Sequence, residues 1–278
     1  MGVSTSFIGK VGDDLFGEQI IEKLNSLNID TSMMQVAERT KTTLAFVSLT
    51  ADGERTFDFY RSPGADQLLH PSNLDMEKLK DANVIHFGSV SLSHEPSRSA
   101  NFQVLDFAAK EGKLVSYDPN LRLELWERKE EARTVALEAA HYADILKISE
   151  EELLFLTEEK TLAHAINRLK KVADIPLIFV TLGAKGCYFY GKTGRGFAPA
   201  PKVSAIDSTG AGDAFMASVL FGIFRYQISI DDLTHNNIEK IATFANHIAA
   251  RSTTQSGGFD VVKGLDEIPL DSLDAERG

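Results

Sequence analysis

Residues 177–183 read LIFVTLG, a short apolar run that closes on a glycine. Runs of this length, rich in β-branched and aromatic residues, are typical of strands, and the lack of polar alternation indicates burial on both faces. Three earlier stretches share this character: NVIHFGSV (83–90), KLVSYDPN (113–120) and DILKIS (144–149). The sequence therefore predicts a set of buried strands, each ending in polar or glycine residues.

Helical patterns separate these strands. Residues 97–111, 129–142 and 162–173 carry apolar side chains three and four positions apart, as one face of a helix requires. Strands that alternate with helices form a mainly parallel sheet with helices on both faces. We therefore expect an α/β, doubly wound fold. Because the sequence contains no internal repeat, low-complexity stretch or Pro-rich linker, we expect a single domain over residues 1–278.

One segment departs from this pattern. Residues 42–61, TTLAFVSLTADGERTFDFYR, alternate in side-chain character before and after Asp52-Gly53, a dipeptide that favours a tight hairpin turn. The segment is expected to form an antiparallel hairpin inserted before the parallel region. Such an element could act as a lid over a ligand or as a contact between subunits.

Composition excludes several classes of partner. With 278 residues, 43% of them hydrophobic, the chain can bury a large core. A formal net charge of −11 argues against nucleic acid or an anionic membrane surface as a partner. No apolar run is long enough to span a membrane, and the single cysteine, Cys187, fits a reducing cytosol. We expect a cytoplasmic protein, and no zinc site, because no histidines have a paired spacing.

Polar and glycine residues gather at the carboxyl ends of the predicted strands, where ligands bind in open α/β sheets. A turn-shaping role alone is a real alternative for the two glycines after residue 181. The residues at these ends are Asp118, Asn120, Arg122, Lys147, the run SEEE (149–152), Thr181, Gly183 and Gly186.

Ser149 and Glu152 have two interpretations. The spacing S-x-x-E before an apolar run is that of a capping box at the start of a helix. A carboxylate at a strand-to-helix turn could also hold the water shell of Mg²⁺, which proteins often bind through one or two carboxylates. The two roles are compatible, and the sequence favours neither.

The stretch AIDSTGAGDAF (205–215) places small residues and a carboxylate at the start of an apolar segment. Residues 214–224 are apolar on nearly all faces, which predicts a buried helix. Backbone N–H groups and the helix dipole make such an amino end an anion site, and small residues let a phosphate approach closely. Asp213 there is either a first-turn residue that stabilises the dipole or a catalytic base, whose pKa burial would raise.

The stretch DSTGAGDAF closely resembles the C-terminal signature of the ribokinase-like (phosphofructokinase B type) carbohydrate kinases. Six further matches follow in family order over nearly the whole chain, and the Tyr-Arg and Asp-Pro-Asn-x-Arg versions look most like the fructokinase branch. They are FIGKVGDDLFG (7–17), FYRSPGAD (59–66), YDPNLR (117–122), LKISEEEL (146–153), TLGAKG (181–186) and ANHIAARSTTQSGG (245–258).

This resemblance implies a kinase that transfers the γ-phosphate of ATP to a sugar hydroxyl with Mg²⁺. By it, Asp213 is the general base and Gly210, Ala211 and Gly212 form the anion hole. Residues on the nucleotide side are Lys147, Thr181, Gly183, Gly186 and Asn246. Glu152 would orient Mg²⁺ through water, and Asp207 and Thr209 lie where relatives bind a monovalent cation such as K⁺. Arg61, Asn120 and Arg122 are the candidates for the sugar side, and the hairpin matches the family's β-lid, through which subunits could dimerise.

The substrate stays open between fructose and another sugar, such as 2-keto-3-deoxygluconate or ribose, and a catalytically silent kinase-like binding protein is the alternative from another class. Relatives begin with a strand carrying a substrate-binding Asp and a Gly-Gly-x-x-x-Asn segment, and too few residues precede Phe7 to supply them. On this ground the sequence predicts an incomplete kinase that is poorly stable and acts weakly on sugar.

Overall fold

The computed structural model describes residues 2–49, 55–61, 63–255 and 257. It divides into two compact units. The C-terminal unit comprises residues 115–120 and the chain from Leu137 onward, and the N-terminal unit comprises residues 2–114 and 121–136. Helix α4 (Lys129–Ala140) begins in the N-terminal unit and ends in the C-terminal one.

The C-terminal unit is built on a sheet whose strands lie in the order β10-β9-β8-β7-β6. Strands β6 (Leu114–Asp118), β7 (Ile145–Ser149) and β8 (Leu177–Thr181) are mutually parallel. Strands β9 (Gly186–Gly191) and β10 (Gly194–Pro199) continue the sheet antiparallel. The three parallel strands fall where the sequence predicts them, which confirms the α/β class. Their carboxyl ends, at Asp118, Ser149 and Thr181, therefore lie at the same edge.

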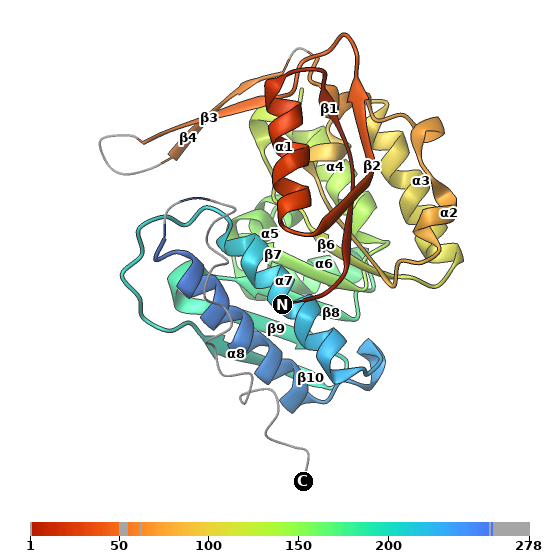
Figure 1. Ribbon diagram of the computed structural model, residues 1–278. Coiled ribbons are helices and arrows are strands. Elements are labelled where there is room, and N and C mark those ends of the chain that lie inside the picture. Colours follow the sequence, from red (N-terminus) through yellow and green to blue (C-terminus); the bar gives the residue numbers. More distant parts are fainter. Residues whose placement is uncertain (1, 50–54, 62, 256, 258–278) are drawn as a thin grey trace. The chain divides into compact units, whose positions relative to one another are not determined.

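Helices α5 (Glu150–Thr157) and α6 (Leu162–Val172) connect the parallel strands β7 and β8. Helices α7 (Ala211–Tyr226) and α8 (His235–Ser252) pack together, with α8 along β9 and β10 (Figure 1). The ring of Phe215 in α7 meets that of Phe179 in β8 edge-on at 5.7 Å. Strand side chains such as Ile145, Ile148 and Phe179 are fully buried, so this sheet carries the core of the unit.

Helix α7 is less buried than its apolar sequence predicts. Phe215, Met216 and Val219 are buried, but Phe224 is 53% exposed and Ala217 is also exposed. An apolar composition on every side of a helix does not require burial on every side, because folded proteins leave much apolar surface in water. The prediction of a buried helix is therefore wrong for Ala217 and Phe224.

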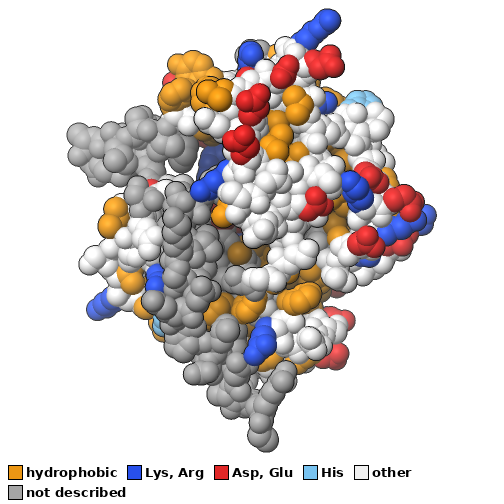
Figure 2. All heavy atoms as spheres, in the orientation of Figure 1, with side chains coloured by type: hydrophobic (Ala, Val, Ile, Leu, Met, Phe, Trp, Pro, Cys, Tyr) orange, Lys and Arg blue, Asp and Glu red, His pale blue; other side chains and the backbone are white. Residues whose placement is uncertain are grey.

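The N-terminal unit begins with a β-α-β element. Strands β1 (Thr5–Gly12) and β2 (Ile29–Ala37) pair in parallel, with helix α1 (Leu15–Ser26) between them in the sequence. The unit also contains helices α2 (Met76–Leu79) and α3 (Ser97–Lys110) and strand β5 (Val84–Gly88). Figure 2 shows hydrophobic side chains among charged ones over α1, and its exposed apolar residues include Leu15, Phe16 and Ile20.

The predicted hairpin is present in the N-terminal unit. Strand β3 (Leu44–Leu49) pairs antiparallel with β4 (Arg55–Tyr60), from Leu44 opposite Tyr60 to Leu49 opposite Arg55. The exposed rings of Phe46 and Tyr60 meet edge-on at 5.2 Å. The predicted turn at Asp52-Gly53 lies outside the described residues. No helix in the described part of the chain is both long and apolar enough to cross a membrane.

Candidate active site

A buried ion pair lies at the carboxyl edge of the parallel strands in the C-terminal unit. The Lys147 Nζ atom lies 2.8 Å from Oδ2 and 3.0 Å from Oδ1 of Asp118. The two side chains are only 8% and 4% exposed. Strands β6 and β7 are neighbours, so Asp118 and Lys147 meet although 29 residues separate them. The sequence identifies Asp118 only as a polar residue at a strand end and does not predict its ion pair with Lys147.

The charges around Asp118 act on one another. Burial raises the pKa of Asp118 to about 6, and the Glu152 and Asp213 carboxylates add to this effect. The Lys147 ammonium opposes it, because an adjacent positive charge favours the ionised carboxyl. The structure therefore brings four residues from three separate sequence motifs into one electrostatic cluster.

The amino end of α7 adjoins this pair. Gly210 precedes the helix with φ +77°, a left-handed conformation that favours glycine, and its N-cap position provides no side-chain hydrogen bond. A Cβ atom on Gly212 would lie 2.6 Å from Lys147 Nζ and 3.9 Å from Asp118 Oδ2. Glycine at both positions thus has a physical cause. The helix of 16 residues presents backbone N–H groups and the positive end of its dipole here, which suits an anion.

Asp213 lies in the first turn of α7 and its side chain is exposed. One of the two interpretations from the sequence is a base whose pKa burial beside a phosphate would raise; the protein itself does not bury this side chain. An exposed carboxylate beside the helix amino end remains accessible to a hydroxyl group of a substrate. Its role as general base stays a prediction.

The capping box of α5 is present. Glu152 Oε2 accepts hydrogen bonds from the Ser149 amide at 2.9 Å and from its hydroxyl at 2.8 Å, while Ser149 Oγ accepts from the Glu152 amide at 3.2 Å. The structural interpretation of this pair is therefore confirmed. The described residues contain no group of three or more His, Cys, Asp or Glu side chains suited to a metal. A carboxylate acting through water, as predicted for Glu152, needs no such group.

The predicted nucleotide residues at the end of β8 differ in their surroundings. Thr181 pairs in register with Ser149 on β7. Gly183 has φ +57° and open space around it, whereas Gly186, with φ +119°, lies where a Cβ would meet the Ala198 carbonyl oxygen at 2.2 Å. Gly186 is thus required for the close approach of β9 and β10, and any contact of either glycine with a nucleotide stays a prediction.

Asn246 on α8 is buried, with 5% of its surface exposed. Its Nδ2 donates to the Ala198 carbonyl at 2.8 Å and lies 3.6 Å from Cys187 Sγ. These bonds tie α8 to β9 and β10. The structure therefore gives this residue a packing role beside its predicted nucleotide role.

The predicted cation residues lie in the loop before α7. Asp207 Oδ1 accepts from the Thr209 amide at 2.8 Å, and Oδ2 accepts from the Gly257 amide at 3.2 Å. The Asp207 amide itself donates to the Thr253 carbonyl at 3.0 Å, just beyond α8. The loop is thus joined to the end of α8, in the unit that contains Asp213.

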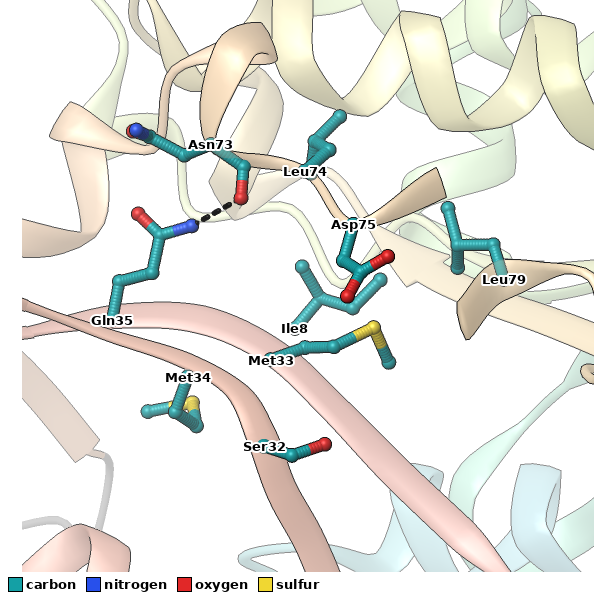
Figure 3. A pocket seen from close by; sticks show the side chains of 9 residues that line it. All are labelled: Ile8, Ser32, Met33, Met34, Gln35, Asn73, Leu74, Asp75 and Leu79. Carbon is teal, nitrogen blue, oxygen red and sulfur yellow. Dashed lines mark hydrogen bonds between the residues drawn. The ribbon is translucent and has the colours of Figure 1, made fainter. Parts of the chain in front are cut away.

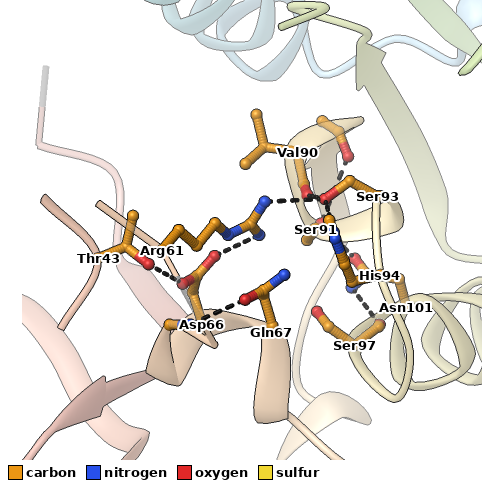
Figure 4. A network of polar contacts seen from close by, with 12 residues as sticks. Thr43, Arg61, Asp66, Gln67, Val90, Ser91, Ser93, His94, Ser97 and Asn101 are labelled. Carbon is orange, nitrogen blue, oxygen red and sulfur yellow. Dashed lines mark hydrogen bonds and ion pairs between the residues drawn. The ribbon is translucent and has the colours of Figure 1, made fainter. Parts of the chain in front are cut away.

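The three predicted sugar residues do not lie in one unit. Asn120 belongs to the C-terminal unit, where it adopts φ +43°, a left-handed conformation that Asn tolerates. Arg122 belongs to the N-terminal unit, and its Nη1 donates to the Leu121 carbonyl at 3.0 Å. Arg61, also in the N-terminal unit, is 4% exposed and pairs with Asp66 at 2.5 Å (Figure 4). The sequence predicts no role for Asp66.

A pocket of about 130 Å³ lies elsewhere in the N-terminal unit, and Figure 3 shows its lining. Gln35 Nε2 donates to the Asn73 carbonyl at 2.6 Å on one side of it. Apolar side chains, including Ile8, Met33 and Leu79, make up much of the wall. None of the site residues predicted from the sequence lines this pocket.

Known proteins resemble the chain over most of its length. Probable fructokinase-3 of Arabidopsis thaliana is 42% identical over 259 residues, which are 93% of this chain and 74% of that protein. Fructokinase-1 of Oryza sativa subsp. japonica is also 42% identical, over 93% of this chain and 80% of its own length.

Solved structures of fructokinases also resemble the chain. Fructokinase from Vibrio cholerae O395 in its fructose-, ADP- and calcium-bound form has a TM-score of 0.84 and 31% identity, over 93% of this chain and 82% of that one. Fructokinase with bound ATP from Xylella fastidiosa has a TM-score of 0.85 and 30% identity, over 94% and 82%. Residues 1–262 match the family described as pfkB family carbohydrate kinase. Because this family match covers nearly the whole chain and the fructokinase relatives align over most of it, the chain belongs to the pfkB family of carbohydrate kinases.

Proposed function

We propose that this protein is an ATP-dependent fructokinase, which transfers the γ-phosphoryl group of ATP to fructose and yields fructose 6-phosphate and ADP. Fructokinases are the named relatives at about two-fifths identity, and a fructokinase with bound fructose and ADP has the same fold. The observation that carries the proposal is the amino end of α7, where Gly212 lies against the Lys147–Asp118 pair and Asp213 occupies the first turn.

The residues at this helix end suit phosphoryl transfer, which depends on positioning and charge stabilisation. The exposed Asp213 carboxylate accepts the proton of the attacking sugar hydroxyl. Backbone N–H groups of Gly210, Ala211 and Gly212 stabilise the negative charge on the transferring group. Lys147, Thr181, Gly183, Gly186 and Asn246 contribute to the nucleotide side, and Arg61, Asn120 and Arg122 to the acceptor side.

Two cations complete the proposal. Mg²⁺ would neutralise charge on the nucleotide phosphates when bound, and the donor chemistry fits, because Glu152 offers a carboxylate at the strand-to-helix turn of the same unit. A monovalent cation such as K⁺ would bind near Asp207 and Thr209, whose loop is fixed to the end of α8. We further propose a cytoplasmic enzyme that dimerises through the hairpin of β3 and β4.

An assay of coupled ADP release over a panel of acceptors tests the proposal. The panel contains fructose, ribose and 2-keto-3-deoxygluconate, each with MgATP, and a reaction without sugar measures the background hydrolysis of ATP. The highest kcat/KM is expected with fructose. A higher value with another acceptor would change the substrate, and no release above background with any acceptor would favour the silent kinase-like protein.

A further inference from the structure

The side chain of Arg61, in the N-terminal unit, is largely buried and is paired with a carboxylate. Arg61 follows β4, its side chain is 4% exposed, and its Nη2 donates to Asp66 Oδ2 at 2.5 Å. Asp66 belongs to the 3-10 turn Ala65–Leu68, directly after the hairpin (Figure 4). The guanidinium is withdrawn from water and the Asp66 side chain is 36% exposed, so the adjacent carboxylate opposes the positive charge of Arg61.

Asp66 cannot easily turn away from Arg61. Its Oδ1 accepts a hydrogen bond from the Thr43 hydroxyl, on the other strand end of the hairpin. The turn that contains it is also fixed, because the Ala65 amide donates to the Lys41 carbonyl at 2.9 Å and the Gly64 amide to Gln67 Oε1 at 2.8 Å. The carboxylate is therefore positioned by the backbone and by Thr43, and is not merely a flexible counter-ion.

Other polar side chains surround the Arg61–Asp66 pair. Its Nη1 donates to Ser93 Oγ at 3.0 Å, and the Nδ1 of His94 lies 3.0 Å from the same oxygen. Burial and the Arg61 charge lower the pKa of His94, against the opposite effect of the Glu127 and Asp66 carboxylates, and this favours the neutral ring. Arg98 is itself paired, with Glu131 at 2.7 Å. In the part of the chain that the structure describes, Arg61 Nε is buried without a hydrogen-bond partner.

We propose that Asp66 determines the class of acceptor, by making the Arg61 region electrically neutral so that it takes an uncharged polyol and rejects an acidic sugar. The inference rests on the proposed function and on the acceptor role of Arg61. A buried guanidinium without a partner would favour an acceptor carboxylate, which could supply the missing negative charge. With Asp66 in place, that carboxylate would instead meet a second one and be repelled. A sugar hydroxyl carries no charge, so the Asp66 carboxylate does not repel it.

The decisive variant is Asp66→Asn, which keeps the size of the side chain and an oxygen to accept from Thr43 but removes the negative charge. The ratio of kcat/KM for fructose to that for 2-keto-3-deoxygluconate is measured in wild type and variant by ADP release. The ratio is expected to fall roughly tenfold or more in the variant, an effect of the size of one lost charge pair at a binding site. Equilibrium binding of the two acceptors to both proteins gives the same ratio without turnover.

Three further variants separate charge from general damage. Asp66→Glu retains the charge and should keep the preference for fructose. Asp58→Asn, which removes an exposed carboxylate from β4, is the matched control and should leave the ratio unchanged. Arg61→Gln removes the cation, so binding of 2-keto-3-deoxygluconate should not increase. Thermal melting shows whether Asp66→Asn folds, and if it folds poorly, Arg61→Gln still tests the proposal.

The outcomes distinguish this inference from the proposed function. If wild type phosphorylates fructose but Asp66→Asn shows an unchanged ratio in both turnover and binding, the role of Asp66 is refuted while the kinase stands. If no acceptor is phosphorylated by wild type, the proposed function fails, and the binding ratio still decides the role of Asp66. Tighter binding of 2-keto-3-deoxygluconate by Arg61→Gln than by wild type would also refute the role of Asp66.

Discussion

Gly212 lies where any side chain would collide with the Lys147 ammonium, since a Cβ atom there would be 2.6 Å from Nζ. Gly212→Ala should therefore push Nζ away from Asp118 and disturb the helix end. Misplacement on this scale costs roughly 10–100-fold in rate, so a loss of that size in kcat is expected. Steady-state kinetics check it. Gly222→Ala is the matched control, because its Cβ would instead press on Ile241 at 2.9 Å, which should lower the melting temperature and leave kcat unchanged.

Asp213 is the second residue whose role can be isolated. Asp213→Asn keeps the size of the side chain but cannot accept the hydroxyl proton, so kcat should fall about 10²–10⁴-fold. The affinity for ATP should change little, since the backbone of the helix end is retained. Turnover close to wild type would remove Asp213 from the mechanism. Glu151→Gln, an exposed carboxylate on α5, controls for the loss of one charge.

Glu152 combines the observed capping role with a predicted magnesium role, and two substitutions separate them. Glu152→Gln can still accept from the Ser149 amide, so the free energy of unfolding should be nearly unchanged, while the Mg²⁺ concentration for half-maximal activity should rise severalfold. Ser149→Ala should do the reverse and lose about 1 kcal/mol of stability. Urea unfolding and magnesium titrations measure the two effects. If Glu152→Gln needs the same Mg²⁺ concentration as wild type, Glu152 has only its capping role.

At the scale of elements, the hairpin of β3 and β4 carries the clearest prediction. A lid that closes over sugar should gain backbone protection when sugar binds. Hydrogen exchange over residues 42–61 is therefore expected to slow with saturating fructose. Exchange that is equally slow with and without fructose would point to a permanent contact between subunits, which a sedimentation measurement of the dimer would then support.

Elements were largely predictable because their signals are local. The apolar runs at 144–149 and 177–183 correspond to β7 (Ile145–Ser149) and β8 (Leu177–Thr181), and alternation at 42–61 corresponds to the hairpin. The burial of α7 was not predictable in the same way. Whether Phe224 is covered depends on which elements pack beside it, and the residue's own helix holds no information on that.

On the scale of the whole molecule, the predicted nucleotide residues all lie in the C-terminal unit, and two single-copy residues report on the units separately. Cys187 is buried in the C-terminal unit, and Trp126 belongs to the N-terminal one. MgATP at 100 times its Kd should stabilise the folded state by about 2.7 kcal/mol. The urea concentration at which a thiol reagent labels Cys187 should therefore be higher with MgATP than without it. Labelling that is insensitive to saturating MgATP would contradict a nucleotide site in this unit.

The sequence predicts the motifs of the site but not which charged side chains form ion pairs. The sequence identifies Asp213 and the small residues before it, because a helix start is a local feature. It does not pair Lys147 with Asp118 or Arg61 with Asp66, since the first pair needs the neighbouring order of β6 and β7 and the second needs the path of the chain after the hairpin. Charges that neutralise each other in the fold look like independent charges in the sequence.

Hydrogen bonds hold the hairpin at both of the strand ends where it joins the rest of the N-terminal unit. Before β3, the Thr42 amide donates to Asp14 Oδ2 at 2.8 Å and its hydroxyl accepts from the Gly12 amide at 2.9 Å. After β4, Arg61 is held by Asp66 and Ser93. Because both strand ends are bound to the rest of the N-terminal unit, any movement of β3 and β4 should be smallest at these ends. Arg61 belongs to this fixed base, so its guanidinium should keep its position beside Asp66 even if the two strands move.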